Sequence, residues 1–153
     1  MTGLPHSHLI TLALDVDFVG IKVIGETPAG LRRIATVTGG SFSGDRLNGI
    51  VIPGADWAIN RPDGVMLLDV RLILQTDDDA LIYLTYQGRF LAEAPALERF
   101  KKGAMLDASE YSIAMTAKFE CGAQRYRWLN DVVAVGSGRQ AATGVTYSIY
   151  QIN

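Results

Sequence analysis

The sequence contains few of the residues from which most metal and nucleophilic sites are built. In 153 residues it has one cysteine, Cys121, and two histidines, His6 and His8. One cysteine excludes an internal disulfide framework and suits a reducing compartment. The two histidines would share one face of a strand, but a structural zinc site needs about four ligands. We therefore predict no metal and no cofactor. Cys121 also lacks the activating histidine neighbour that a nucleophilic thiolate would need.

Charge of one sign and long apolar runs are also scarce. The formal net charge is -2 at pH 7, so no large positive field exists to hold nucleic acid. Near the N-terminus, Thr11 and Asp15 interrupt the apolar residues and no basic segment precedes them. We therefore predict no signal peptide, no membrane span and a cytoplasmic location. With 48% hydrophobic residues and a mean hydropathy of +0.16, we expect a single globular domain over residues 1–153.

What the sequence does contain is apolar residues at a period of two. In Val65–Thr76 every even position from 66 to 74 is apolar, whereas the odd positions include Asp69 and Arg71. Successive side chains of a strand point to opposite faces, so this segment predicts a strand with two different surfaces. The polar run Asp77–Asp79 and the next alternating segment, Leu81–Tyr86, complete a predicted hairpin. The same criterion predicts further strands at His8–Asp17, Gly20–Ile24, Leu31–Thr38, Leu47–Ile52, Tyr111–Glu120, Val132–Val135 and Val145–Ile152.

These segments predict an all-β fold of about nine or ten strands with one short helix, at Pro95–Lys102. A further helical turn is expected near Tyr126–Asn130, and a mobile loop at Gly136–Gly144. Asp69 and Arg71 share their strand face with a leucine and an isoleucine. A charge pair between apolar residues is typical of a barrel interior that holds a ligand. We therefore predict a closed antiparallel β-barrel, rather than a sandwich, with both charged side chains pointing inward.

The glycine-rich stretch between residues 39 and 64 allows three interpretations. Gly39 and Gly44 have the glycine spacing of a phosphate-binding loop, but Asp45 stands where that loop requires lysine, and a predicted strand follows instead of a helix. A linker is disfavoured because the stretch contains core-forming residues such as Phe42 and Trp57. We favour the third interpretation, the lip of a binding cavity, in which glycines mark bulges and corners of a barrel strand.

The same stretch resembles a known family. Its pattern GG-x-F-x-G-x-R-L-x-G, followed by PGADW, looks like the signature of the DUF3237 family, also called UPF0311. The resemblance implies a compact antiparallel β-barrel of the lipocalin-like, or calycin-like, kind and supplies no function. The chain departs from the family pattern at Cys121, where threonine is expected. Further matches cover nearly the whole chain: Asp63–Gly64, Asp69–Arg71, Thr76–Asp78, Tyr83, Tyr86, Gly88, Phe119–Glu120, Tyr126, Trp128–Asn130 and Tyr147–Tyr150.

Two pairs of neighbouring residues could do chemistry. An indole beside the Asp56 carboxylate, from Trp57, would remove water and raise the pKa of that carboxyl toward the range of a useful acid or base. The alternative is an aspartate that caps a turn and a tryptophan that belongs to the core. Asp69 could hold the Arg71 guanidinium against an anionic or carbonyl group of a ligand. The alternative is a structural ion pair or a solvated edge.

A third group lies toward the C-terminus and comprises Glu120, Trp128 and Asn130. Trp128 could stack on a ring, and Asn130 could orient a carbonyl. Alternatively, Trp128 plugs one end of the barrel and Asn130 caps a turn.

From these residues we expect a module that binds a small apolar or aromatic molecule inside the barrel. The alternative is a cofactor-independent isomerase, cyclase or lyase, with Asp56 or Glu120 as general acid or base and Arg71 stabilising an oxyanion. An interaction protein with an exposed strand edge forms a third class. A homodimer is compatible with the sequence, which has no feature that decides the oligomeric state. The expected ligand contacts are Trp57, Asp69, Arg71, Tyr83, Tyr86, Trp128 and Asn130.

Overall fold

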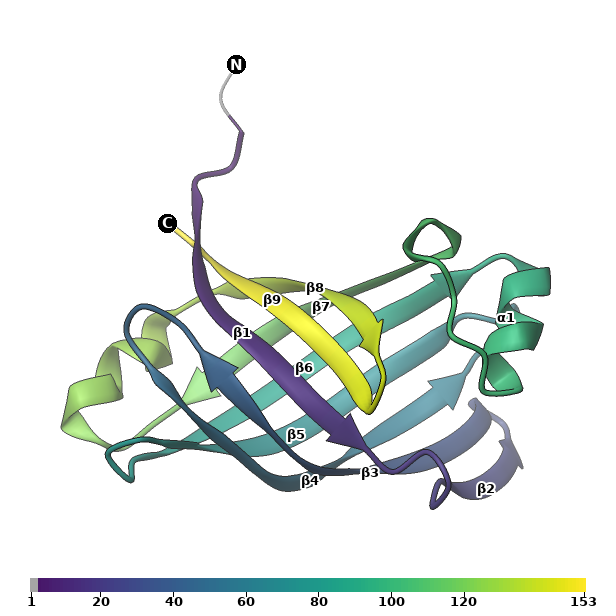
Figure 1. Cartoon of the computed structure of the whole chain (residues 1–153), viewed down its shortest axis with the longest axis horizontal. Coiled ribbons are helices and arrows are strands. Elements are labelled where there is room, and N and C mark those ends of the chain that lie inside the picture. The colour runs from purple at the N-terminus through teal and green to yellow at the C-terminus, as the bar shows by residue number, and fades with distance from the viewer. Residues whose placement is uncertain (1–2) are drawn as a thin grey trace.

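The chain folds into a closed antiparallel β-barrel with one additional strand (Figure 1). The computed structural model describes residues 3–153. Within them, strand β1 pairs with both β9 and β3, and this double pairing closes the ring. The strands are β1 (His6–Val16), β2 (Lys22–Thr27), β3 (Gly30–Ser43), β4 (Asn48–Asn60), β5 (Met66–Thr76), β6 (Leu81–Ala92), β7 (Tyr111–Glu120), β8 (Ala134–Ala141) and β9 (Gly144–Ile152). The predicted all-β antiparallel barrel is therefore confirmed.

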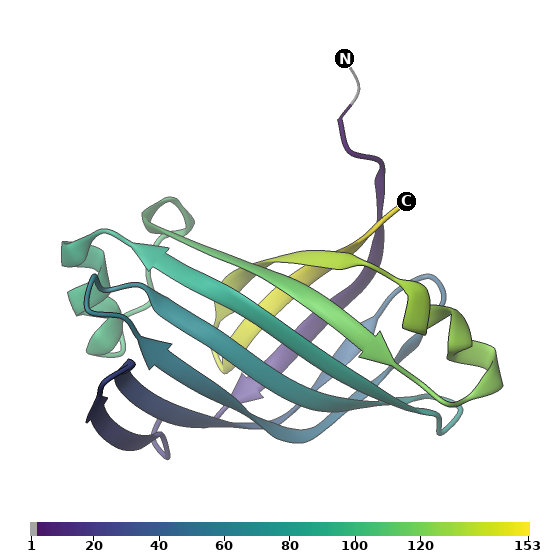
Figure 2. The same ribbon diagram turned by 180° about the vertical axis from the view of Figure 1, so that it is seen from behind.

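Strand β3 is long enough to serve two neighbours on the same edge. Its first part pairs with β2, which lies outside the closed ring, and its last part pairs with β1. From β3 to β9, each strand pairs with the next strand of the chain. Figure 2 shows the far wall, in which β5, β6 and β7 run side by side along the barrel. Short connections and antiparallel neighbours are what the period-two segments and their turn residues predict.

Within residues 3–153, three helical segments lie at the two ends of the barrel. The helix α1 (Ala94–Lys101) and the short 3-10 helix η1 (Ala108–Glu110) connect β6 to β7 at one end. The 3-10 segment η2 (Gln124–Asp131) connects β7 to β8 at the other end. None of the helices found in residues 3–153 is long and apolar enough to cross a membrane.

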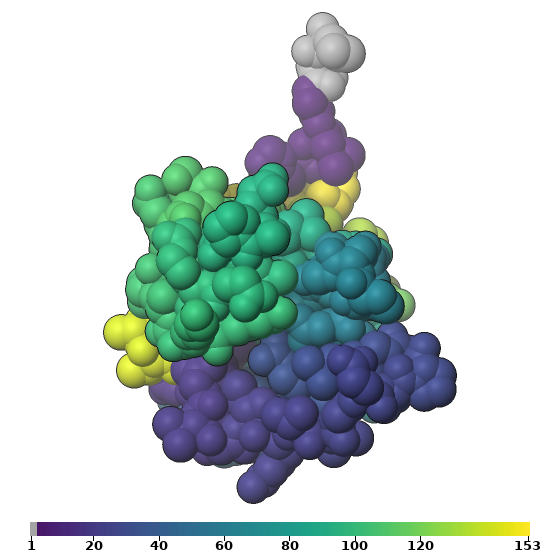
Figure 3. Space-filling view, turned by 90° about the vertical axis from the view of Figure 1, so that its right-hand side faces the viewer, coloured from purple at the N-terminus to yellow at the C-terminus, as the bar shows by residue number. Residues whose placement is uncertain are grey.

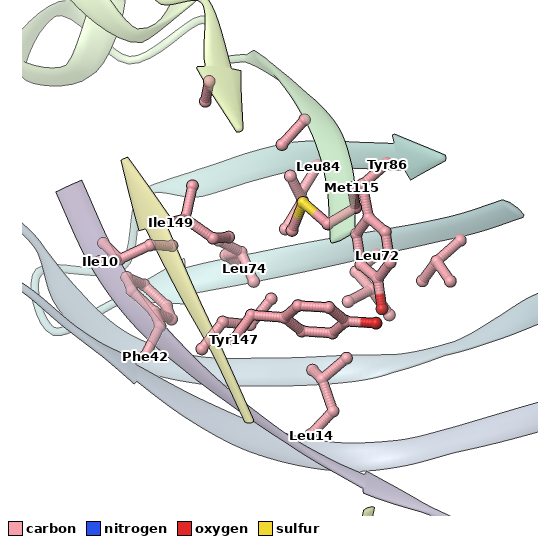
Figure 4. Close-up of a cluster of buried hydrophobic side chains, with 14 of the residues drawn as sticks. Ile10, Leu14, Phe42, Leu72, Leu74, Leu84, Tyr86, Met115, Tyr147 and Ile149 are labelled. Carbon is pink, nitrogen blue, oxygen red and sulfur yellow. The ribbon is translucent and has the colours of Figure 1, made fainter. Parts of the chain in front are cut away.

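The interior is packed with apolar side chains at the η2 end. Leu74 and Ile82, from the hairpin of β5 and β6, are fully buried there, as is Leu129 from η2. The Tyr126 hydroxyl donates to the Asp78 carboxylate at 2.8 Å, which fastens η2 to that hairpin. Figure 4 shows part of this cluster, in which side chains from several strands meet. This half of the barrel is therefore a filled core, as small eight-stranded barrels commonly have.

The segment Gly136–Gly144, expected to be a mobile loop, is mostly the regular strand β8. Gly136 and Gly138 face the interior, where larger side chains occupy the space that a Cβ would need. A Cβ on Gly138 would lie 2.7 Å from the Tyr147 ring. The glycines that suggested flexibility therefore permit close packing against β9, and the loop prediction is wrong for this strand.

Candidate functional site

A cavity of about 370 Å³ occupies the barrel end near α1. Apolar side chains from β1, β3, β5, β6 and β9 form most of its wall. Its lining also includes Phe18 and Ile21 from the connection between β1 and β2, and Phe100 and Met105 from α1 and the loop that follows it. Figure 3 looks at this end, where the purple N-terminal segments lie next to the green segment of α1. The cavity has the size of a small-molecule site.

The Asp56 side chain reaches this cavity because β4 contains a bulge. The pairing of β4 with β5 shifts register between Ile52 and Ala55. Val51, before the shift, lies in the core, and Asp56, after it, lines the cavity. An extra residue in one strand reverses which positions face inward, and bulges are frequent beside active sites. The predicted cavity lip in this stretch is thus a strand whose bulge turns one carboxylate toward the cavity.

The Asp56 carboxyl is electrostatically unusual. Burial raises its pKa from 3.8 to about 6, and the nearby negative charge of Asp69 acts in the same direction. Two features oppose this rise: the backbone N–H of Asp69, which donates to Oδ1 of Asp56 at 3.0 Å, and the positive charge of Arg33. Such a carboxyl exchanges its proton near neutral pH, which suits a general acid or base. The predicted cause was wrong, because the Trp57 indole lies on the outer face and the dehydration comes from the barrel interior.

Two tyrosine side chains reach the same part of the interior. The rings of Tyr86 and Tyr147 are 5.1 Å apart at 62°, and Figure 4 shows their hydroxyl oxygens next to each other. Burial, together with the hydrogen bond between the two hydroxyls and the charge of Asp56, raises the pKa of Tyr86 well above its usual range. Burial raises the pKa of Tyr147 as well. Both hydroxyls therefore stay protonated at neutral pH. The bond between them uses the O–H of Tyr86, so the O–H of Tyr147 is the one left to donate to a ligand.

Arg33 supplies a positive charge to the cavity wall. Its Nε donates to Oδ1 of the buried Asn60 at 3.1 Å, and Nη2 approaches the sulfur of Met66 at 3.3 Å. Desolvation by burial lowers the pKa of Arg33, and the charge of Asp56 counteracts this effect. Because the ordinary pKa of an arginine side chain is so high, the guanidinium stays charged at neutral pH.

The side chains of five predicted site residues point outward from the barrel wall. On β5, Leu68, Val70, Leu72 and Leu74 are buried, whereas Arg71 on the alternate face is exposed and Asp69 is only half-buried. The prediction that Asp69 and Arg71 point inward is therefore wrong. The fully apolar face of β5 buries more hydrophobic surface than the mixed face, and so it forms the core. The other residues placed on the outer wall are Trp57, Tyr83 and Glu120.

The remaining candidates, Trp128 and Asn130, belong to η2 at the filled end. The Arg46 guanidinium stacks on the Trp128 ring, 3.7 Å from its centroid. The Asn130 side chain accepts from the Cys121 N–H at 3.0 Å and donates to the Cys121 carbonyl at 2.8 Å, so it holds a turn. The Asn130 contacts match the turn cap that the sequence left open as an alternative, and Trp128 packs, partly buried, against the hydrophobic core.

A second hollow of about 400 Å³ lies beside η2 and brings together three predicted residues, Tyr83, Glu120 and Asn130. All three are exposed. The exposed Glu120 carboxylate remains hydrated, and a hydrated charge interacts weakly with a ligand. The Asn130 amide is already bonded to Cys121. Of the sequence-based candidates, only Asp56 and Tyr86 line the cavity near α1.

Arg33 and Tyr147 were missed, although their strands carry a signal. Within Leu31–Thr38, Arg33 falls on the same face as Ala35 and Val37, which is the more apolar face. Tyr147 likewise alternates in step with Val145 and Ile149. A charged or hydroxyl-bearing residue on the apolar face of a barrel strand was the pattern to look for. Within residues 3–153, no group of three or more histidine, cysteine, aspartate and glutamate side chains is placed to hold a metal ion.

Comparison with known proteins places the chain among related barrels. The UPF0311 protein RPA1785 of Rhodopseudomonas palustris is 32% identical over 129 residues, which are 84% of each chain. Its crystal structure superimposes with a TM-score of 0.90 over the whole of both chains, at 28% identity. A beta-barrel like protein of Acinetobacter baumannii, ABAYE2633, is 34% identical, with a TM-score of 0.85 over 100% of this chain and 98% of the other.

One more distant relative has a named activity. The hydroalkoxylation enzyme phnH of Penicillium herquei is 25% identical over 115 residues, which are 75% of this chain and 62% of that protein. The family described as "Protein of unknown function (DUF3237)" matches residues 5–152. Given that match and relatives that are over 30% identical along most of their length, the chain belongs to the DUF3237, or UPF0311, family.

Proposed function

We propose that the barrel binds a small, mainly apolar molecule in the cavity near α1 and transfers a proton to or from it through Asp56. The single observation that carries the proposal is a carboxyl group with a pKa of about 6 in the wall of an apolar cavity. Carboxyl groups of this kind are frequent in acid–base sites. The protonated hydroxyl of Tyr147, held by its hydrogen bond with Tyr86, would orient an oxygen atom of the ligand.

The reaction class we propose is an intramolecular cyclisation by addition of a hydroxyl group to a carbon–carbon double bond. Protonated Asp56 gives its proton to one alkene carbon, and the substrate's hydroxyl oxygen forms a bond to the other. The proton of that hydroxyl then returns to the Asp56 carboxylate, so the reaction is an isomerisation without a co-reactant. Hydroalkoxylation is the activity named for phnH, and it supports this choice over other isomerase or lyase chemistry.

The test uses 2-(3-methylbut-2-enyl)phenol, which carries a hydroxyl group and an alkene in one apolar molecule. We expect the purified protein to form the cyclic ether, detected by chromatography, with one deuterium on carbon when the reaction runs in deuterium oxide. Asp56→Asn is expected to lower the rate by about 10²–10⁴-fold, the usual contribution of a general acid. Glu120→Gln removes an exposed carboxylate outside the cavity and should leave the rate unchanged. A fully active Asp56→Asn protein contradicts the role of Asp56.

The pH profile provides a second check on the same group. If Asp56 acts as the acid in the rate-limiting step, the rate falls as the pH rises through about 6. The other charged and titratable groups near Asp56 are Arg33, Tyr86 and Tyr147, which share the cavity wall, and Asp69, whose charge acts from the outer face of β5. The two tyrosines titrate far above this range, so they should add no inflection near pH 6. A profile that is flat from pH 5 to 8 contradicts acid catalysis by Asp56.

Binding without chemistry is the second candidate function, and the mainly apolar wall favours it. It predicts that Asp56→Asn binds small aromatic molecules as the parent does, while neither protein exchanges deuterium into any of them. Deuterium incorporation by the parent, lost in Asp56→Asn, excludes this candidate.

A further inference from the structure

Among the charged groups that line the cavity, a cation on β3, Arg33, lies next to an acid on β4, Asp56. A second cation of the lining, Lys101 of α1, forms an ion pair with Glu98. Arg33 on β3 lies opposite Ala58 on β4, and Ala35 lies opposite Asp56. Arg33 and Asp56 are therefore diagonal neighbours on the inner face of one strand pair, and such neighbours have Cα atoms about 7–8 Å apart. Both line the cavity. In the part of the chain that the structure describes, residues 3–153, the two side chains form no ion pair with each other, so neither is directly neutralised by the other.

The Arg33 guanidinium has more N–H donors than its hydrogen bonds to the protein use. Its hydrogen bonds use Nε, to Asn60, and Nη2, to the weakly accepting sulfur of Met66. Among the ion pairs formed within residues 3–153, none includes Arg33. A guanidinium carries five N–H groups in a planar fork that matches two oxygen atoms of a carboxylate. Asn60, only 8% exposed, holds Nε in place, so the fork keeps a defined direction without a carboxylate partner from the protein.

Arg33 is half-buried in a mainly apolar wall, and within residues 3–153 it forms no direct ion pair, although the charge of Asp56 acts on it from a distance. A partly desolvated charge without close compensation is unfavourable. The arrangement becomes favourable when a ligand supplies the negative charge. We infer that Arg33 binds an oxyanion of the ligand, so that the cavity selects small apolar molecules that carry a carboxylate or a similarly delocalised anionic oxygen. This inference rests on the proposed function, because it assigns the class of molecule to the same cavity.

An oxyanion bound at Arg33 also lies near Asp56, and two negative charges repel each other. Asp56 would then bind a proton when the anion binds. The affinity for an anionic ligand should therefore fall as the pH rises above about 6, and this dependence should disappear in Asp56→Asn. Protonated Asp56 is also the form that the proposed reaction needs.

The experiment compares 2-naphthoate with 2-naphthamide, two molecules of nearly the same shape that differ in charge. Dissociation constants are measured by calorimetry at pH 6 for the parent, Arg33→Met and Arg32→Met. Arg32 is the matched control, because it is the next residue on β3 and its Nη1 donates to the Trp57 carbonyl on the outer wall at 2.7 Å. We expect Arg33→Met to lower the affinity for 2-naphthoate at least about tenfold and the affinity for 2-naphthamide less than twofold. Arg32→Met should change neither.

Three results overturn the inference. In the first, 2-naphthoate binds Arg33→Met within twofold of the parent. In the second, Arg33→Met lowers the affinity for both probes equally, which means that Arg33 shapes the cavity and does not recognise charge. In the third, the parent binds 2-naphthamide as tightly as 2-naphthoate. Circular dichroism verifies that Arg33→Met is folded. Arg33→Lys keeps the charge but loses the planar fork, so it should have an intermediate affinity for 2-naphthoate.

The proposed function is tested by a separate measurement, the cyclisation rate of Asp56→Asn. If Asp56→Asn cyclises the prenylated phenol as fast as the parent, acid–base catalysis by Asp56 is wrong whatever Arg33 binds. If the parent binds neither naphthalene probe, both the binding part of the proposed function and the Arg33 inference are contradicted.

Discussion

At the scale of single residues, the buried Asp56 carboxyl lowers the stability of the fold at neutral pH, and the same burial gives it a pKa suited to proton transfer. Burial disfavours its charged form and is the largest cause of the rise of its pKa to about 6. The hydrogen bond from the Asp69 N–H recovers only part of that energy. Strained or desolvated groups of this kind persist where the surrounding fold is stable enough to hold them, and they gather at functional sites.

The pH dependence of stability tests this statement. The folded-state pKa of Asp56, about 6, lies above the ordinary value of 3.8, so folding takes up a proton between these values. Stability therefore falls as the pH rises from about 4 to above 6. Asp56→Asn removes this titration, so the unfolding free energy of the variant relative to the parent should increase by about 2–3 kcal/mol from pH 4 to pH 7.5.

Urea unfolding at both pH values measures that difference. Glu120→Gln, which removes an exposed carboxylate, should show a much smaller change with pH. A stability difference for Asp56→Asn that is the same at pH 4 and pH 7.5 means that the carboxyl is not buried as described.

At the scale of elements, irregular positions in two strands shape the cavity. The register shift in β4 turns Asp56 inward, and the glycines of β8 make room for large side chains from β9. A Cβ on Gly138 would lie 2.7 Å from Cε1 of Tyr147 and 3.1 Å from Cγ2 of Ile113. The Tyr147 ring can therefore lie flat against β8 only where no side chain projects from that position.

Gly138→Ala should disturb the site through this contact. The added methyl group overpacks the interior, so we expect a loss of about 1–3 kcal/mol in the unfolding free energy. The Tyr147 ring must move, and the affinity for 2-naphthamide should fall. Gly122→Ala is the control, because no atom lies within 4 Å of the Cβ it would add, and its effect should stay within about 0.5 kcal/mol. Equal stabilities of the two variants would contradict the close packing of β8 on β9.

At the scale of the whole molecule, the barrel is filled at one end and hollow at the other. Strand β1 joins the last strand of the chain to the third, so the two halves of the interior share one closed wall. Small domains of this kind usually unfold in one cooperative transition. A ligand that occupies the hollow end should therefore stabilise the complete barrel and not one region of it.

Thermal unfolding checks this expectation. At a concentration of 100 times its dissociation constant, 2-naphthoate should add about 2.7 kcal/mol, which corresponds to a rise in Tm of about 5–11 °C for a chain of this size. Circular dichroism should show one transition with and without the probe. Ala35→Phe places a ring in the cavity and should abolish the shift, because Ala35 lines its wall. A shift that persists in Ala35→Phe would place the binding site elsewhere.

The period-two alternation, the turn residues and the family signature were enough to predict an antiparallel barrel from the sequence. The strands at residues 65–76 and 111–120 were predicted almost to the residue, since their alternation is strict. The extensions of β3, β4 and β6 were missed, because glycines, prolines and polar residues in them hide the alternation. Their extended conformation comes from pairing with neighbouring strands.

By itself, the sequence determined that the strands have two faces and that Asp56 and Tyr86 were candidates for a site. Only the tertiary structure decided which face of each strand turns inward. Both faces of β5 carry apolar residues, so Arg71 could be placed on either side until ring closure buried Leu72 and its neighbours. A one-residue shift reverses every side chain after it, and such a shift depends on the pairing partner. The meeting of Arg33, Asp56, Tyr86 and Tyr147, from four different strands, is set by barrel closure and not by any local pattern.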